Sequence, residues 1–242
     1  MDIKRVVNPT LQVKRSVIII GGFASTLADF NPLVEQLKSW CTPITILLPE
    51  GDFPTVIEKI QSFIESLSSR PLPIIGYSMG GRIALELLKK KPELFERAIC
   101  LSSRLNTPEF CPTKRGDFEA LVQKQLLSLS ISDFFHWWYQ LPIFAGYIPS
   151  SKLLKEKMKI GSYQLLEQFS NLSILKQPPL TPPFKLPIHL VYGSKDSLKE
   201  EIKDCFKDSL EPIFIHNIPE SGHLIHLEQP ALVSQLLKKV IQ

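Results

Sequence analysis

Glycine is scarce in this 242-residue chain, with 11 residues, whereas proline, with 20, is frequent. Average usage is about 7% glycine and about 5% proline, so a collagen-like repeat and a flexible glycine-serine linker are both excluded. The longest apolar runs, such as residues 17–20, are far shorter than the roughly 20 residues that cross a bilayer. The net charge is only +4, which argues against a nucleic-acid-binding domain, because such domains carry a concentrated basic patch.

Cysteine is sparse as well. The four cysteines lie far apart and form no Cys-x-x-Cys pair, so the sequence predicts buried free thiols rather than a zinc site or a redox motif. Residues 1–15 alternate charged and apolar side chains and lack the continuous apolar stretch of a signal peptide. We therefore expect a cytoplasmic protein with no membrane or nucleic acid among its partners.

Short runs rich in β-branched residues recur along the chain. The first, Ser-Val-Ile-Ile-Ile at residues 16–20, is apolar at consecutive positions and ends at a glycine pair, which is typical of a strand buried on both faces of a parallel sheet. Apolar residues at helical spacing lie between such runs, for example at residues 56–67. This alternation predicts an α/β fold, with a mostly parallel sheet flanked by helices. The six strands are expected at residues 16–20, 43–48, 72–75, 97–102, 187–192 and 212–218.

The alternation stops between about residues 105 and 185, where the pattern is helical only. An insertion of this kind predicts a helical cap over the carboxyl edge of the sheet, where open α/β sheets bind ligands. It ends in a segment with five prolines in eleven residues, at 177–187, which we interpret as an extended connector rather than a ligand for an SH3-type partner. We predict a single domain over residues 1–242 that carries this cap.

The clearest chemical motif is Gly-Tyr-Ser-Met-Gly-Gly at residues 76–81. It matches the G-x-S-x-G pattern, follows a predicted strand and precedes a predicted helix, which is the context of a nucleophile elbow. Such a turn holds the serine in a strained conformation with its hydroxyl exposed, and the flanking glycines keep Cβ atoms away from the neighbouring chain. We therefore predict that Ser78 is a nucleophile.

A serine nucleophile needs a base, and the base needs an acid that orients it. His223 follows the strand expected at residues 212–218, so its imidazole should reach the sheet edge where Ser78 lies; His226 is the alternative base. Asp196 follows the preceding strand in the run Val-Tyr-Gly-Ser-Lys-Asp. We predict that Asp196 accepts the Nδ1 proton of His223, and its alternative role is to cap the next helix.

A developing oxyanion is stabilised by N–H groups that point at it. The N–H of Met79, at the start of a helix, is one candidate. Gly-Gly-Phe at residues 21–23 follows the first strand, and glycine permits close backbone approach, so the N–H of Phe23 is the second candidate. The alternative for this segment is a tight turn with no catalytic role.

These motifs, taken in order with the cap in its place, resemble the α/β-hydrolase superfamily over nearly the whole chain. The resemblance implies an α/β-hydrolase fold and a catalytic triad of Ser78, Asp196 and His223. It does not identify the reaction, because this fold supports many reactions. No metal cluster or phosphate-binding loop is present in the sequence, so no cofactor is expected.

Residues 76–82 and 134–145 resemble the elbow and cap signatures of the 2-succinyl-6-hydroxy-2,4-cyclohexadiene-1-carboxylate synthase (MenH) family. That family eliminates pyruvate from an anionic, multiply carboxylated small molecule. The resemblance implies that Ser78, activated by His223, abstracts a substrate proton. It also implies a set of substrate-binding residues, namely Tyr77, Arg82 and Trp138, with Arg115 and Lys159 where the family has cap arginines.

Two segments depart from the family pattern. Gly21 stands where a histidine is usual, and Leu-Leu-Pro-Glu-Gly-Asp at residues 47–52 replaces the usual Asp-Leu-Pro-Gly-His-Gly. Lysine at position 159 also lacks the bidentate geometry of arginine. The alternative function is therefore a carboxylesterase or thioesterase, for example a pimeloyl-thioester methyl esterase that meets an acyl-carrier protein. A non-catalytic binding module that kept the fold is a third alternative.

Overall fold

The structure is a computed structural model, and it describes residues 14–106, 112–180, 184–199 and 213–242. Its centre is a six-stranded sheet with the order β2-β1-β3-β4-β5-β6, in which every neighbouring pair is parallel. All six strands coincide with the predicted apolar runs to within a few residues, so the predicted fold class is confirmed. The strands are β1 (Ser16–Ile20), β2 (Thr42–Ile46), β3 (Leu72–Tyr77), β4 (Phe95–Leu101), β5 (Ile188–Gly193) and β6 (Ile213–Ile218).

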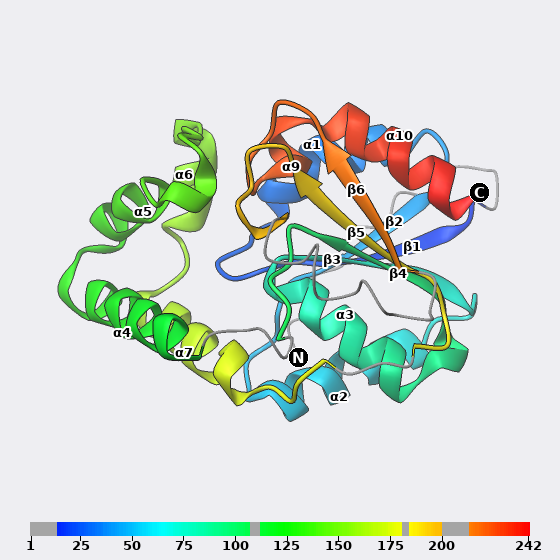
Figure 1. Cartoon of the computed structure of the whole chain (residues 1–242), viewed down its shortest axis with the longest axis horizontal. Helices are drawn as coiled ribbons and strands as arrows, with labels where there is room; N and C mark the ends of the chain where they lie inside the picture. The colour runs from blue at the N-terminus through cyan, green and yellow to red at the C-terminus, as the bar shows by residue number, and fades with distance from the viewer. Residues whose placement is uncertain (1–13, 107–111, 181–183, 200–212) are drawn as a thin grey trace.

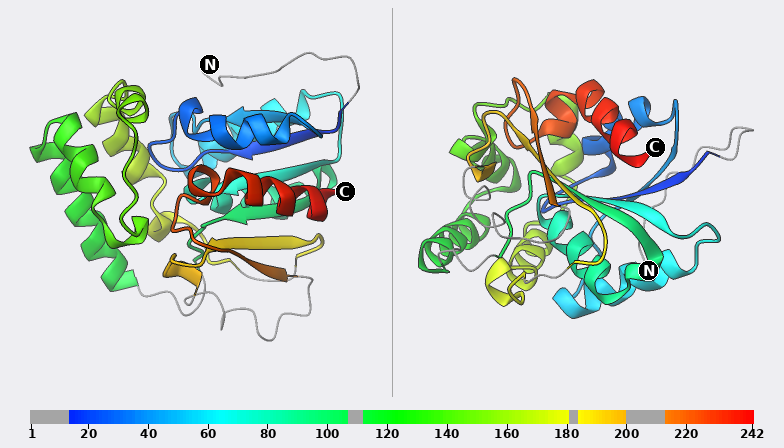
Figure 2. Two further views of the ribbon diagram at one scale, coloured as in Figure 1. Left: turned by 90° about the horizontal axis from the view of Figure 1, so that it is seen from above. Right: turned by 45° about the vertical axis from the view of Figure 1, so that its right-hand side comes forward.

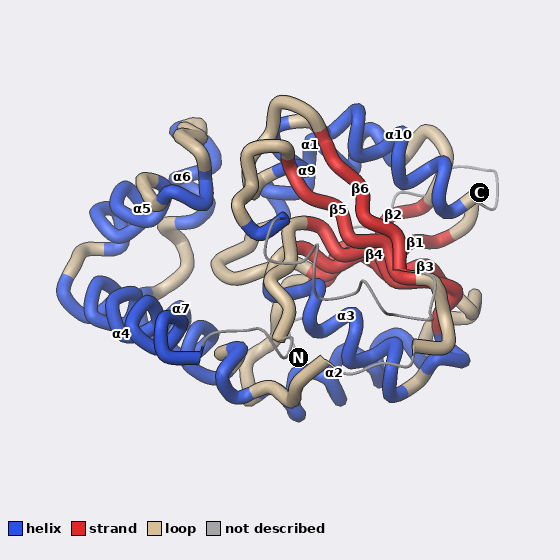
Figure 3. Tube along the Cα trace, viewed as in Figure 1, coloured by secondary structure: helices blue, strands red, loops and turns tan. Residues whose placement is uncertain are grey.

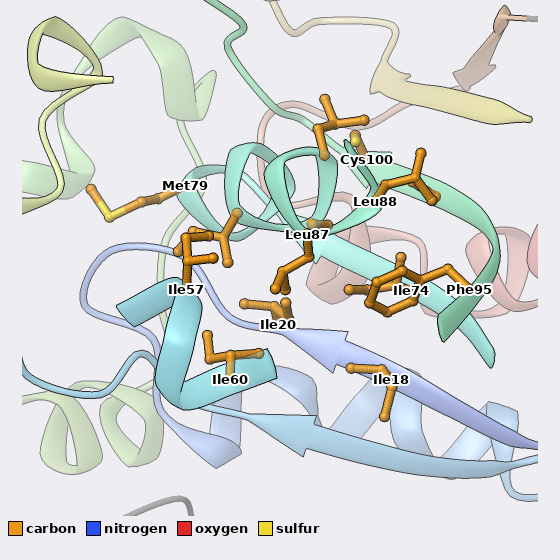
Figure 4. Packing of buried hydrophobic residues seen from close by; sticks show 14 of the residues in the cluster. Ile18, Ile20, Ile57, Ile60, Ile74, Met79, Leu87, Leu88, Phe95 and Cys100 are labelled. Atoms are coloured by element: carbon orange, nitrogen blue, oxygen red, sulfur yellow. The ribbon is translucent and has the colours of Figure 1, made fainter. Parts of the chain in front are cut away.

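Helices cover both faces of the sheet (Figure 3). Residues alternate between the faces along each strand, so Val17 and Ile19 belong to one buried cluster and Ile18 and Ile20 to the other. The first cluster packs against α1 (Leu27–Leu37), α9 (Ile225–Glu228) and α10 (Pro230–Ile241). The second packs against α2 (Phe53–Glu65) and α3 (Met79–Lys90), as Figure 4 shows around Ile57 and Leu87. A short 3-10 turn, η1 (Pro92–Leu94), leads from α3 into β4.

Between β4 and β5 the described chain forms helices and no strand. Figures 1 and 2 show these helices as a group beside the sheet, beyond the ends of the strands. They lie in the segment where the sequence pattern is helical only. The division of the chain into one domain with a cap stays a prediction. The elements are α4 (Pro112–Ser128), α5 (Ile131–Tyr139), η2 (Pro142–Phe144), α6 (Ser151–Lys157), α7 (Ser162–Asn171) and η3 (Ile174–Lys176).

Two further predictions concern the whole chain. Cys41 and Cys100 are buried free thiols, as predicted, whereas Cys111 and Cys205 lie outside the described residues. Within the ranges that the structure describes, none of the helices has both the length and the apolar character that a bilayer crossing requires.

Candidate active site

Ser78 occupies the sharp turn between β3 and α3. Its backbone is left-handed, with φ 50° and ψ −111°, a conformation that non-glycine residues rarely adopt. The Ser78 N–H donates a 2.8 Å hydrogen bond to the carbonyl of Leu101 at the end of β4, which ties the strained residue to the sheet. Such strain persists only where the surroundings enforce it, and it is concentrated at functional sites.

The glycines around Ser78 allow the strand and the helix to approach closely. A Cβ atom on Gly76 would lie 2.3 Å from the carbonyl oxygen of Gly80. A Cβ atom on Gly80 would lie 2.4 Å from the carbonyl oxygens of Ile20 and Gly21. Both distances are far below van der Waals contact, and the opposing atoms are backbone. Glycine is therefore required at these two positions, and part of the chain's small glycine content is used here.

His223 and Asp196 complete a hydrogen-bonded series with Ser78. His223 Nε2 lies 3.1 Å from Ser78 Oγ, and His223 Nδ1 lies 3.0 Å from Asp196 Oδ2. The other carboxylate oxygen of Asp196 accepts from the N–H of Leu198 at 3.1 Å, so the side chain also makes the local capping contact that we considered as its alternative role. Asp196 and His223 are buried, which shields the series from water.

The loops that carry His223 and Asp196 are tied to each other. The N–H of Ser194 donates to Ile218 at 2.8 Å, and the N–H of Lys195 donates to Ser221 at 2.9 Å. These loops follow the neighbouring parallel strands β5 and β6, so their residues meet at one edge of the sheet. The structure therefore brings together the three residues that the motifs selected.

His226, the alternative base, lies elsewhere. Its ring is fully buried, stacks on Phe30 with centroids 5.0 Å apart and approaches Tyr77 at 4.2 Å. Neither ring nitrogen has a hydrogen-bond partner among the described residues. Burial lowers the pKa of His226 to about 3, so the ring is neutral. Of the two histidines, only His223 contacts Ser78.

Two backbone N–H groups near Ser78 lack a hydrogen-bond partner within the described chain. Met79 begins α3, so its N–H has no acceptor inside the helix. Phe23 lies between two residues whose N–H groups are bonded, since Gly22 donates to Ser25 Oγ at 2.9 Å and Ala24 donates to the side-chain oxygen of Gln168 at 2.9 Å. These are the two N–H groups predicted as oxyanion donors.

A small cleft of about 40 Å³ lies beside Ser78 and His223. Its lining is mixed: rings come from Phe23, Tyr77, Trp138, Tyr139 and Phe144, and polar groups come from Ser25, Asp29, Ser78, Lys157 and His223. Trp138 packs edge-on against Phe23 with ring centroids 5.2 Å apart. The predicted substrate-binding residues Tyr77 and Trp138 therefore line this cleft.

Arg82 does not line the cleft, which corrects its predicted position. Its guanidinium is buried, and it donates to Gln177 Oε1 at 2.8 Å and to the carbonyl of Leu172 at 3.1 Å. Burial, together with the nearby Arg115, lowers the pKa of Arg82 to about 9. Arg82 connects α3 to the segment after α7, so its contacts are structural.

Each of the two predicted cap cations is paired with a nearby glutamate. Arg115 donates a 2.7 Å hydrogen bond to Glu119 on its own helix and lies over the ring of Phe118. Lys159 is exposed and pairs with Glu156 at 2.6 Å. Neither residue is among those that line the cleft.

An ion pair that we did not predict lies in the cleft instead. Lys157 Nζ is 2.8 Å from Asp29 Oδ1, and their side chains are only 5% and 3% exposed. Lys157 is four residues after Leu153, and these two are the buried residues of α6. That spacing was the signal available in the sequence.

Comparisons with known proteins address the fold of this chain. A family model described as alpha/beta hydrolase fold matches residues 38–230. The 2-succinyl-6-hydroxy-2,4-cyclohexadiene-1-carboxylate synthase of Salmonella newport is 22% identical over 246 residues, which cover 94% of each chain. Protein PHYLLO, chloroplastic, of Arabidopsis thaliana is 25% identical over 209 residues, covering 80% of this chain but 12% of that much longer protein.

A solved structure described as MenH from S. aureus superposes with a TM-score of 0.82 at 18% identity, covering 95% of this chain and 94% of that chain. This similarity extends over the sheet and the cap region alike. The family model alone spans well over half of the sequence. The chain therefore belongs to the α/β-hydrolase fold family.

Proposed function

We propose that this chain is a serine-dependent enzyme that acts at a carbonyl group. The observation that carries the proposal is the hydrogen-bonded series from Ser78 through His223 to Asp196. In this mechanism His223 Nε2 takes the proton of Ser78 Oγ, and Asp196 holds the Nδ1–H and stabilises the imidazolium that forms. The N–H groups of Phe23 and Met79 stabilise the negative charge that develops on the carbonyl oxygen.

For the reaction itself, we propose the elimination catalysed by the synthase family. In that chemistry the activated Ser78 removes a proton from the substrate, the oxyanion donors stabilise the enolate-like charge, and pyruvate leaves. No water needs to attack. Similarity to the Salmonella synthase over 94% of both chains supports this assignment, as does the aromatic wall formed by Tyr77 and Trp138.

Hydrolysis of a carboxylic ester or thioester is the second candidate, and one observation favours it. A multiply carboxylated substrate needs cationic partners. Arg82, Arg115 and Lys159 are not among the residues that line the cleft, and Lys157, which lines it, is already paired with Asp29.

Two substrates assayed side by side separate these candidates. Purified protein is given the synthase family's own substrate, with pyruvate release as the readout, and p-nitrophenyl acetate, with p-nitrophenol as the readout. Ser78→Ala is the test variant, and Ser39→Ala, at an exposed position of the described chain, is the matched control. Ser78→Ala should abolish turnover of whichever substrate is used, whereas Ser39→Ala should match wild type.

Each outcome has a definite meaning. Ser78-dependent pyruvate release supports the elimination. Fast ester turnover without pyruvate release favours the hydrolase. Equal rates for wild type and Ser78→Ala on both substrates would refute a catalytic serine.

A further inference from the structure

The loop at residues 22–25, which carries the Phe23 N–H, is held by two side chains of the cap. We propose that Gln168 on α7 and Lys157 on α6 are positioning residues that fix this loop, and with it the Phe23 oxyanion donor. The inference rests on the proposed function, since it assigns Phe23 to an oxyanion hole. On this proposal, the oxyanion site is complete only while the cap helices contact the loop at residues 22–25.

Both peptide groups of Ala24 are bonded to the cap. The Ala24 N–H donates to Gln168 Oε1 at 2.9 Å, and the Ala24 carbonyl accepts from Lys157 Nζ at 2.8 Å. Ala24 has a φ of 55°, in the left-handed region that alanine rarely adopts. A strained residue keeps such a conformation only when its surroundings over-determine it. Gln168 and Lys157 supply that restraint directly after Phe23.

Lys157 is itself firmly anchored. Its ammonium is paired with Asp29 Oδ1 at 2.8 Å, and the other oxygen of Asp29 accepts from the N–H of Thr26 at 2.6 Å and from its hydroxyl at 2.8 Å. One cap lysine therefore bridges the oxyanion loop and the start of α1. Because the pair is almost fully buried, water competes weakly for it.

The loop has little support of its own. Its internal hydrogen bonds join only Gly22 and Ser25, through the Ser25 hydroxyl at 2.9 Å and the Ser25 N–H at 3.3 Å. The Phe23 ring packs against two cap rings, Trp138 at 5.2 Å and Phe169 at 4.9 Å. Both the backbone and the side chain of this loop thus depend on the cap. If the cap shifted, the Phe23 N–H would move relative to Ser78.

Matched substitutions on α7 test the role of Gln168. Gln168→Leu removes the acceptor of the Ala24 N–H, whereas Gln168→Glu keeps an acceptor at the same place. Gln164→Leu, at an exposed position one turn earlier, is the control. For p-nitrophenyl acetate we expect Gln168→Leu to lower kcat about tenfold with KM nearly unchanged, because a displaced donor weakens the transition state more than the ground state. Gln168→Glu should restore most of kcat, and Gln164→Leu should match wild type.

A double variant, Lys157→Met with Asp29→Asn, tests the contact between Lys157 and the Ala24 carbonyl. It leaves no buried carboxylate unpaired. Its control is Lys155→Met, on the exposed face of α6. We expect the double variant to lose kcat as Gln168→Leu does. The melting temperature of each variant reports whether it is folded. In folded proteins, wild-type kcat for both Gln168→Leu and the double variant would overturn the inference. So would a Gln168→Glu variant as slow as Gln168→Leu.

The same activity assays distinguish a failure of the positioning role from a failure of the proposed function. Turnover that depends on Ser78 but ignores Gln168 and Lys157 refutes the positioning role alone. Turnover that survives Ser78→Ala refutes the catalytic serine, and the oxyanion assignment of Phe23 falls with it.

Discussion

The buried imidazole of His226 predicts a loss of stability in acid that one substitution should remove. The ring is 0% exposed, packs against Phe30 and Tyr77, and has no hydrogen-bond partner among the described residues for either nitrogen. Burial is the main cause that lowers its pKa to about 3. Of the charged groups that face the ring, Asp29 raises this pKa, whereas Lys157 and His223 lower it further. A proton on His226 therefore destabilises the folded chain.

The sign and size of the effect follow from linkage. In the unfolded chain His226 titrates near its ordinary pKa of about 6.5. Between that value and about 3, the unfolded state binds a proton that the folded state does not, so stability is complete above the unfolded pKa and falls as the pH decreases through this window. At about pH 5 the loss is about 2 kcal/mol relative to neutral pH. This figure depends almost wholly on the unfolded value, because pH 5 is still well above the folded pKa.

Chemical and thermal unfolding of wild type and His226→Leu, at about pH 5 and about pH 7.5, measure this loss. On acidification wild type should lose about 2 kcal/mol more than the variant, or about 4–8 °C more in Tm for a chain of this size. His189 and His216, whose pKa values burial also lowers, contribute equally to both proteins. His136→Leu, at an exposed position of α5, should keep the wild-type pH dependence. Parallel pH dependences for wild type and His226→Leu would refute the reasoning.

Three further predictions concern the site and its support. Arg82→Met removes two buried hydrogen bonds and should lower the free energy of unfolding by about 2–4 kcal/mol. KM for an anionic substrate should stay within about twofold of wild type. A large rise in KM at unchanged Tm would contradict the structural placement of Arg82. Asp196→Asn should lower kcat on the order of 10⁴-fold with little change in Tm, because His223 would lose the acceptor that fixes its tautomer. Rates near those of wild type would exclude an orienting role for Asp196. Gly80→Ala should yield little folded protein, as measured by circular dichroism, because its Cβ would lie 2.4 Å from two backbone oxygens; a normally folded and active variant would argue against so tight a turn.

The fold could be predicted from the sequence because its signals are local. A parallel strand that is buried on both faces is apolar at consecutive residues, and β1 shows this over Val17–Ile20, all of them fully buried. The residues of the candidate site also carry local signals. Ser78 lies in a glycine-flanked turn, and His223 and Asp196 each follow a strand, so the order of elements alone places them at one sheet edge.

The direction of each charged side chain could not be predicted in the same way, because it depends on distant partners. Arg82 lies one turn after Ser78, and its spacing fits a cleft-facing cation as well as a buried one. Its acceptors, Gln177 and Leu172, are 95 and 90 residues away in the chain. Lys157 likewise is buried beside the cleft because its ammonium bonds to Asp29 and to the carbonyl of Ala24. Periodicity identifies a buried position on a helix, but only the packed structure supplies the partner.

These partners bear directly on the choice of substrate. The chain has a net charge of +4, yet the cations nearest the cleft are neutralised or satisfied locally: Lys157 by Asp29, Arg115 by Glu119 and Arg82 by amide and carbonyl oxygens. A carboxylate in the cleft would meet two sources of positive potential, the N-terminus of α3 beside Ser78 and the ammonium of Lys157. An ammonium carries three N–H donors, of which Asp29 and the Ala24 carbonyl take two, so a carboxylate that accepts from the third displaces neither partner. A carboxylate that drew Lys157 away from Ala24 would loosen the loop that holds Phe23, whereas a neutral ester would leave this contact unchanged.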